Sequence, residues 1–214
     1  MIQWVWQACL EATTLDDLLV ATDDTRIADV VHAFGGKVEL TRADHESGSD
    51  RLAEVATRHP ADLLVNIQGD EPLMDGAVID AVVAQLVADP ECQCATAVTT
   101  FRDRAELESP DTAKVILARS GHALYFSRAP IPFCRDGQPD LADYHKHIGI
   151  YGYRRPLLER LGSLTGHLET VERLEQLRLL ENGIAVRVAR VAYQPLGVDR
   201  PADIAAVEAL LAQR

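Results

Sequence analysis

The sequence predicts an α/β fold with a mainly parallel sheet, and three observations lead to this prediction. Short apolar segments alternate with segments of helical periodicity through the first hundred residues. The segment 61–68 is predominantly apolar, as in strands that are buried on both faces of a parallel sheet. Gly35-Gly36 and Pro60 follow two of the helical segments, at positions where helices commonly end.

Helices and strands are expected to alternate in the first half of the chain. An amphipathic pattern predicts a helix over 1–12, the apolar run 17–22 predicts a strand, and helical periodicity returns over 24–34. A strand is then expected over 37–41 and, after a polar loop, a helix over 51–59 that ends at Pro60. The remaining elements of this half are the strand 61–68, a helix over 76–88 and a β-rich segment over 94–101.

The alternation of helical and strand segments changes near residue 114. The segments 114–118 and 123–127 are β-rich and flank a turn sequence, which predicts a hairpin. The elements expected after the proline-rich stretch 130–139 are a strand near 147–153, helices over 155–162 and 168–182, a strand over 184–191 and a helix from residue 201. No linker divides the chain, so we expect one domain over 1–214, with 114–150 as an inserted β-rich subdomain and candidate dimer interface.

Composition excludes several classes of function. The chain has 33 acidic and 21 basic residues and a formal net charge of −12, which argues against non-specific binding of nucleic acid. No apolar run is long enough to span a bilayer, and the first residues lack the pattern of a signal peptide, so we expect a cytoplasmic protein without a membrane partner. The four cysteines lack the spacing of a zinc site, and we expect them to be reduced thiols.

Two acidic segments follow expected strands. Asp70 lies in Gln-Gly-Asp-Glu-Pro directly after the strand 61–68, and Asp199 lies in Gly-Val-Asp-Arg-Pro before the last helix. Ligands of α/β sheets gather at the carboxyl ends of strands, so Asp70 and Asp199 are candidates to hold one divalent cation. Alternatively, the first segment is only a turn and Asp199 only caps the last helix.

A polar loop leads into the helix expected at 51–59. The loop 44–51 offers small residues, hydroxyl groups and Arg51, and main-chain amides at a helix start can receive an anion. The alternative is an ordinary capped loop, with Ser49 as the N-cap and Arg51 in solvent.

One strand and one helix carry further candidates. His147 and Tyr151 share a face of the strand near 147–153, and His145 lies on the same face. Two histidines without a third ligand at a recognisable spacing favour a substrate-lining or surface pair over a metal site. Glu175 and Gln176 belong to a charged helical segment, whose default interpretation is a solvated face.

Six segments, taken together, resemble the 3-deoxy-manno-octulosonate (Kdo) cytidylyltransferase family. They occur in the order of the family and span nearly the whole chain: TRADHESGSDRLAEV (41–55), VNIQGDEP (65–72), KVILARSGHALYFSRAPIP (114–132), HIGIYGYR (147–154), ETVERLEQLRLLENG (169–183) and GVDRPADI (197–204).

The resemblance implies a three-layer, Rossmann-like nucleotidyltransferase that transfers a cytidylyl group from CTP to Kdo. The products would be pyrophosphate and CMP-Kdo, a precursor for lipopolysaccharide synthesis. The anomeric hydroxyl of Kdo would attack the α-phosphorus of CTP, with Mg²⁺ as the cofactor on the phosphates. The resemblance also implies a homodimer.

Carried over residue by residue, the resemblance assigns catalytic roles to Asp70, Arg51 and Asp199, with Asp70 and Asp199 as the magnesium ligands. Residues Ser47, Gly48 and Ser49 would approach the cytidine. The Kdo pocket would be lined by Gln68, Arg128, His147, Tyr151, Glu175 and Gln176. Arg128 suits this substrate, because an arginine can pair with a carboxylate through two hydrogen bonds.

One departure from the family concerns the start of the chain. Family members open with a strand and a loop resembling IPARxxSxRLPGKPL, which embraces the triphosphate, whereas residues 1–4 match the helix that follows this loop. An active enzyme is expected if that loop is encoded upstream of Met1. If the chain begins at Met1, the alternative is a catalytically impaired sugar- or nucleotide-binding protein. A further alternative is a cytidylyltransferase for a close analogue of Kdo.

Overall fold

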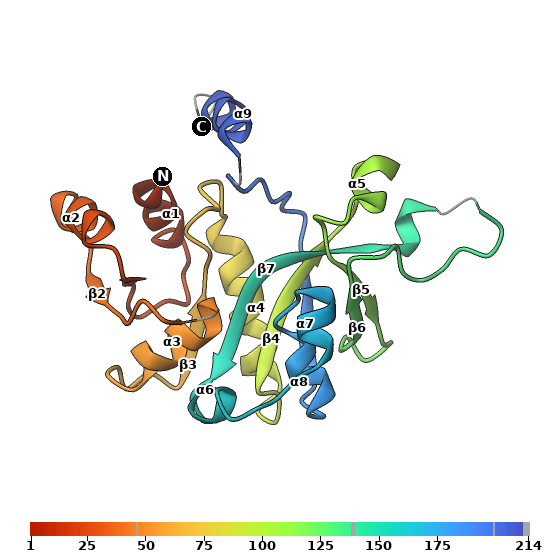
Figure 1. The fold of residues 1–214 in the computed structure, drawn as a ribbon, viewed down its shortest axis with the longest axis horizontal. Coiled ribbons are helices and arrows are strands. Elements are labelled where there is room, and N and C mark those ends of the chain that lie inside the picture. The colour runs from red at the N-terminus through yellow and green to blue at the C-terminus, as the bar shows by residue number, and fades with distance from the viewer. Residues whose placement is uncertain (46, 138–139, 199, 212–214) are drawn as a thin grey trace.

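The structure, a computed structural model, describes residues 1–45, 47–137, 140–198 and 200–211. A six-stranded sheet forms its centre, with helices on both faces (Figure 1). Its strands are β3 (Leu63–Asn66), β4 (Cys94–Thr99), β5 (Lys114–Leu117), β6 (Ala123–Ser127), β7 (His145–Arg154) and β8 (Val186–Arg190). None of the helices in these ranges has the length and apolar character that are needed to cross a membrane.

The long strand β7 organises the sheet. The strand order is β6-β5-β7-β4-β8, and β3 pairs with the carboxyl-terminal half of β7. Strands β3, β4 and β5 each pair antiparallel with β7, and β8 pairs parallel with β4. Strands β3, β4, β5 and β8 therefore run in one direction, as a mainly parallel sheet requires, while β7 runs against them between its neighbours.

A second, two-stranded sheet lies beside the first. It consists of β1 (Val20–Thr22) and β2 (Val38–Leu40), which pair in parallel. The helices of this half are α1 (Ile2–Cys9), α2 (Thr25–Ala33) and α3 (Gly48–Ala56). In the part of the chain that the structure describes, no strand connects β1 to β3. The family's opening strand ahead of α1 stays a prediction.

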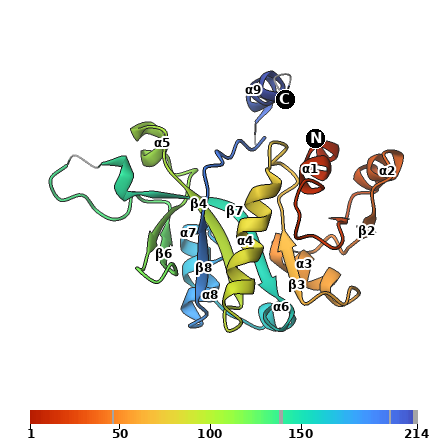
Figure 2. The ribbon, with the colours of Figure 1, turned by 180° about the vertical axis from the view of Figure 1, so that it is seen from behind.

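Alternating side chains of β4 build two cores, which makes the architecture three-layered. Cys94 and Val98 point into a cluster with the leucines of α6 (Arg155–Leu161) and α8 (Leu177–Glu181). Ala95 and Ala97 point the other way, into a cluster with α1 and α4 (Gly76–Ala88). Figures 1 and 2 show these helices on opposite faces of the sheet. Helices packed on both faces of one sheet confirm the predicted α/β class.

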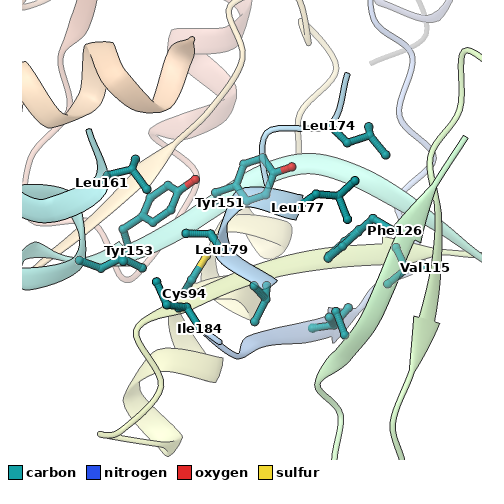
Figure 3. Packing of buried hydrophobic residues seen from close by; sticks show 14 of the residues in the cluster. Cys94, Val115, Phe126, Tyr151, Tyr153, Leu161, Leu174, Leu177, Leu179 and Ile184 are labelled. Carbon is teal, nitrogen blue, oxygen red and sulfur yellow. The ribbon is translucent and has the colours of Figure 1, made fainter. Parts of the chain in front are cut away.

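The core next to α8 contains two tyrosines of β7. Tyr151 and Tyr153 stack with ring centroids 6.0 Å apart, and Figure 3 shows them near Leu177 and Leu179. Phe126 of β6 is fully buried in the same cluster. These side chains bring β6, β7 and α8 together, and the candidate site described below adjoins them.

The hairpin over 114–127 is confirmed. Lys114 lies opposite Ser127 in the antiparallel β5–β6 pair, and Gly121 in the connecting turn has a φ of 85°, which favours glycine. The pair is continuous with the central sheet, because β5 also pairs with β7. The interpretation of 114–150 as an inserted dimerisation subdomain stays a prediction.

The prediction of one helix over 168–182 is wrong. The segment forms α7 (Leu168–Glu172) and α8, and the chain breaks at Arg173, which has a left-handed φ of 52°. The guanidinium of Arg128 donates to the carbonyl oxygens of Glu172 and Arg173 at 2.8 and 3.1 Å. A long-range contact thus satisfies carbonyls that an uninterrupted helix would have bonded internally.

The start of the third helix and the presence of a short fifth helix also differ from expectation. The third helix begins at Gly48 rather than at residue 51, because Ser47 is its N-cap, so the alternative in which Ser49 caps it is wrong. The helix α5 (Arg104–Glu108) was not expected; Asp103 caps it by accepting from the amide of Glu106 at 2.8 Å. The last helix, α9 (Pro201–Leu211), begins where the sequence predicts.

Asp80 ties the loop after α1 to α4, and its replacement gives a pH-dependent prediction. Its carboxylate accepts hydrogen bonds from the amides and hydroxyls of Thr13 and Thr14 at 2.6–3.1 Å. These bonds, those of Thr14 first, lower its pKa from 3.8 to about 2. Because the folded-state pKa is depressed, the stabilisation is complete above pH 3.8 and is lost as the pH falls toward 2.

We expect Asp80→Asn to lower Tm at pH 7 by about 2–4 °C, corresponding to about 1 kcal/mol, since the site is partly exposed. The Tm difference from the unmodified protein should shrink below pH 4. Thermal unfolding of both proteins between pH 7 and 2.5 measures this. A difference that does not change with pH would contradict the assignment to the charged carboxylate.

Candidate active site

The described site residues come from five parts of the fold: the loop after β3, the start of α3, the strand β7, the end of β6 and the segment that joins α7 to α8. Most of them lie in loops or at element ends, while His147 and Tyr151 lie within β7, and only the fold brings these parts together. The contacts between them are described in this order below.

Asp70 lies in the turn directly after β3. The amide of Val198 donates to the carbonyl oxygen of Asp70 at 2.9 Å, so the segment 197–198 lies against this turn. Asp199, the second predicted ligand, lies outside the described residues. Among the described residues, no group of three histidine, cysteine or carboxylate side chains is arranged to hold a metal ion. Asp70 beside the 197–198 segment still fits Mg²⁺, which needs only one or two carboxylates when substrate phosphates and water complete its shell.

The start of α3 carries the predicted nucleotide contacts. Ser47 accepts from the amide of Asp50 at 3.1 Å and donates to the Asp50 carboxylate at 2.6 Å, so this hydroxyl is engaged in capping. Gly48 lies close to β3: a Cβ atom on it would be 3.2 Å from Asn66 Nδ2 and 3.6 Å from Gln68 Nε2. A Cβ atom at position 48 would therefore crowd Asn66 and reach ordinary contact distance of the predicted sugar-binding residue Gln68.

Ser49 joins the predicted nucleotide and sugar residues. Its side chain is buried, and its Oγ lies 3.0 Å from the Tyr153 hydroxyl and donates to Glu175 Oε2 at 3.1 Å. Because the Ser49 proton goes to Glu175, the Tyr153 hydroxyl donates to Ser49. Glu175 is exposed, as the default interpretation expects, and its hydrogen bond with Ser49 directs its carboxylate toward the start of α3.

Arg51 connects α3 with the ends of β1 and β2. One guanidinium nitrogen lies 3.0 Å from a carboxylate oxygen of Asp23, which follows β1, and another donates to the Thr41 hydroxyl after β2. Arg51 therefore belongs to an ion pair at the carboxyl ends of these strands, and the alternative in which it is simply solvated is wrong.

His147 and Tyr151 lie on one face of β7, as predicted. Their ring centroids are 5.4 Å apart, and the rings of Phe126 and His147 form a T-shaped pair with centroids 5.2 Å apart. The Cγ of Gln68 would lie 3.9 Å from a Cβ atom on Gly149, between them in sequence, so Gln68 packs over the same face. The structure thereby brings Gln68, His147 and Tyr151 together.

Arg128 makes many main-chain contacts. Its guanidinium donates to the carbonyl oxygens of Pro110, Glu172 and Arg173 at 2.8–3.1 Å, and its amide donates to the Glu172 carboxylate at 2.9 Å. These bonds fix the loop before β5 against the end of α7. That Arg128 also binds a substrate carboxylate stays a prediction.

Gln176 begins α8 and is buried, with 3% of its surface exposed. Within the described ranges, its Nε2 atom is buried without a hydrogen-bond partner. A buried amide without a partner is costly, so this donor is suited to a ligand that supplies an acceptor.

The sequence did not indicate two residues that contact the candidate site residues. Tyr153 holds Ser49, and Thr96 of β4 lies 2.9 Å from His147 Nε2 through its hydroxyl. Thr96 is fully buried in a strand whose residues are all buried, and a buried threonine in such a strand has no local pattern that marks it as functional. Tyr153 could have been noticed, since it has the same parity on β7 as His147 and Tyr151.

We predict that His147 remains neutral throughout the physiological pH range. Burial of its ring lowers the pKa from 6.5 to about 3. Its neutral state is fully populated above pH 6.5, and since the unfolded chain binds the proton more readily, this ring reduces stability as the pH falls from 6.5 toward 3. The ¹H–¹³C NMR signal of its imidazole should not move between pH 5 and 8, whereas it should titrate in the denatured protein. A midpoint near 6.5 in the folded state would contradict the prediction.

Known proteins resemble this chain in sequence over almost its whole length. The family model described as Cytidylyltransferase matches residues 1–188. A protein of Syntrophobacter fumaroxidans named 3-deoxy-manno-octulosonate cytidylyltransferase is 48% identical over 217 residues, which cover 100% of this chain and 87% of the relative. A protein of the same name from Geobacter metallireducens is 45% identical over 214 residues, covering 95% of this chain and 84% of the relative.

Solved structures give the same result. A CMP:2-keto-3-deoxy-manno-octonic acid synthetase complexed with CTP superposes with a TM-score of 0.93 at 42% identity, covering 99% of this chain and 87% of that chain. A 4-diphosphocytidyl-2C-methyl-D-erythritol synthase from Anaerococcus prevotii has a TM-score of 0.65 at 13% identity, covering 100% of this chain and 86% of that chain, and so shares only the fold.

Proposed function

This chain belongs to the cytidylyltransferase family, and on that premise we propose that it transfers the cytidylyl group of CTP to Kdo. The observation that carries the proposal is the 42–48% identity to relatives of that name over almost the whole chain, together with the likeness to a synthetase structure that holds CTP. Contacts between residues that the family pattern assigns to the two substrates support the proposal. Gln68 packs near His147 and Tyr151, and Ser49 donates to Glu175.

In the reaction, the anomeric hydroxyl of Kdo forms a bond to the α-phosphorus of CTP, and the bond from that phosphorus to the bridging oxygen breaks. Pyrophosphate leaves with the bonding electrons, and the hydroxyl proton passes to solvent. The task of the protein is to align the two substrates and to stabilise charge on the phosphoryl oxygens.

Each substrate has a set of candidate residues in this fold. Ser47, Gly48 and Ser49 would approach the cytidine at the start of α3, where the Asp50 amide is bonded to the Ser47 hydroxyl and the Ser49 hydroxyl to Glu175. Arg51, held by Asp23, would place positive charge near the reacting phosphate. The buried Gln176 amide and Glu175 would orient the sugar through its hydroxyl and carboxylate groups.

Asp70 and Asp199 would hold Mg²⁺ at the carboxyl ends of the strands. When bound, the ion would neutralise charge on the triphosphate. The contact between Val198 and Asp70 supports this pairing, since it brings the neighbour of Asp199 to the β3 turn.

The complete gene product, supplied with CTP, Kdo and Mg²⁺, should release pyrophosphate and form CMP-Kdo in equal amounts, measured by a coupled phosphate assay and by mass spectrometry. Reactions without Kdo are the control. Tight CTP binding without any turnover would overturn the proposed activity in favour of a binding protein, and a strong preference for an amino-substituted analogue of Kdo would change the substrate. The cytoplasmic location and the homodimer stay predictions.

A further inference from the structure

An irregularity in the β4–β7 pair places main-chain carbonyls beside a buried hydroxyl. Thr96 pairs with Tyr151, but the next residue of β4, Ala97, pairs with Ile148, so Gly149 and Ile150 have no partner on β4. The Oγ1 of Thr96 donates to the carbonyl oxygen of Ile150 at 2.7 Å, and the Ile148 carbonyl lies 3.3 Å away. The only proton of the Thr96 hydroxyl is therefore donated to the carbonyl oxygen of Ile150 in this bulge.

The remaining bond of Thr96 determines the tautomer of His147. Thr96 Oγ1 and His147 Nε2 are 2.9 Å apart. Carbonyl oxygens only accept, so a Thr96 proton turned toward His147 would leave the Oγ1 lone pairs facing the Ile150 oxygen at 2.7 Å. The favourable arrangement is the one in which His147 Nε2 carries the hydrogen and donates to Thr96.

The other ring nitrogen is then an acceptor. His147 is neutral because its burial lowers its pKa, so it carries a single ring proton, at Nε2. Within the described residues, no hydrogen bond engages Nδ1. The rings of Phe126 and Tyr151 contact the imidazole at centroid distances of 5.2 and 5.4 Å and hold its orientation.

We propose that Thr96 is a positioning residue, which fixes His147 in the Nε2–H tautomer so that Nδ1 accepts a hydrogen bond from a hydroxyl group of the sugar substrate. The tautomer follows from contacts within the chain alone, whereas the identity of the donor rests on the proposed function. Sugar hydroxyls are abundant donors in Kdo, and the predicted nucleotide residues Ser47, Gly48 and Ser49 lie at the start of α3, not on β4 or β7. Thr96 should therefore affect the sugar and not the nucleotide.

The tautomer can be measured without any substrate. Long-range ¹H–¹⁵N correlation spectra of ¹⁵N-histidine-labelled protein distinguish a protonated from an unprotonated ring nitrogen, and His147→Gln identifies the signal. We expect Nε2–H in the unmodified protein and in Thr96→Ser, which keeps the hydroxyl. Thr96→Val, which has nearly the same shape but no hydroxyl, should show a mixture of tautomers or Nδ1–H.

Kinetics supply the second readout. Thr96→Val should raise the KM for Kdo about tenfold, the equivalent of one lost hydrogen bond, and leave the KM for CTP unchanged. Thr96→Ser should behave like the unmodified protein, even though it also loses a buried methyl group, so a purely structural role would not reproduce this pattern. Unfolding curves confirm that both variants are folded under assay conditions.

Separate results would overturn the two parts of the inference. An Nδ1–H tautomer in the unmodified protein, or an unchanged tautomer in Thr96→Val, would refute the positioning role. If the tautomer responds as expected but the KM values for Kdo and CTP rise equally, the sugar contact is wrong. Absence of any Kdo-dependent turnover in the unmodified protein would refute the substrate and leave the control of His147 by Thr96 established.

Discussion

Replacing Asp70 with asparagine is expected to abolish Kdo-dependent pyrophosphate release at ordinary magnesium concentrations. The substitution keeps the shape of the side chain and removes its charge, and a neutral amide is a much weaker ligand for Mg²⁺ than a carboxylate. Asp70 lies in the turn after β3 that the 197–198 segment contacts. The substitution should therefore weaken the binding of the Mg²⁺ that neutralises the triphosphate. We expect at least a 100-fold decrease in kcat/KM, on the order of 3 kcal/mol of transition-state stabilisation.

A matched control lies at the other end of the same strand. Asp62 is exposed and directly precedes β3, and Asp62→Asn should leave turnover unchanged. Activity of the Asp70→Asn protein is then measured against magnesium concentration, and CTP binding is measured by calorimetry with and without the ion. Retained turnover, or a loss that is identical in both variants, would exclude Asp70 as an essential ligand.

Replacing Phe126 with alanine should cause the largest loss of stability among the variants considered. Phe126 is fully buried on β6, in the core that also contains Leu177 of α8, and its ring forms a T-shaped pair with His147 at a centroid distance of 5.2 Å. Truncation removes apolar contacts and leaves a cavity between β6 and the helices. We expect the free energy of unfolding to fall by about 3–5 kcal/mol.

Chemical denaturation measures this loss, and the same strand supplies the control. Leu124 is 60% exposed, so Leu124→Ala should change the free energy of unfolding by less than about 0.5 kcal/mol. If enough Phe126→Ala protein remains folded, its KM for Kdo should also rise, because the His147 ring loses a contact that orients it. A decrease below 1 kcal/mol would mean that the core collapses around the missing ring.

Much of the fold follows from local pattern. The helix 76–88 occurs at the predicted residues, and the strands near 114–118 and 123–127 pair as predicted, since apolar period and turn residues act over a few positions. The errors occur where distant contacts override local preference. Helical periodicity continues through 168–182, but Arg128, which is 45 residues away from Arg173, binds the carbonyls at the break.

For the candidate site, the sequence by itself determined which chemical groups are present and that Asp70 would follow a strand, because a strand end is a local feature. The tertiary structure alone decided which groups meet. Ser49 contacts Glu175 across 126 positions, and Thr96 contacts His147 across 51. It also decided that Arg51 pairs with Asp23 and that His147 is neutral. Burial and hydrogen-bond partners set ionisation and tautomer, and both depend on how β4, β7, α3 and α8 pack together, which no single segment specifies.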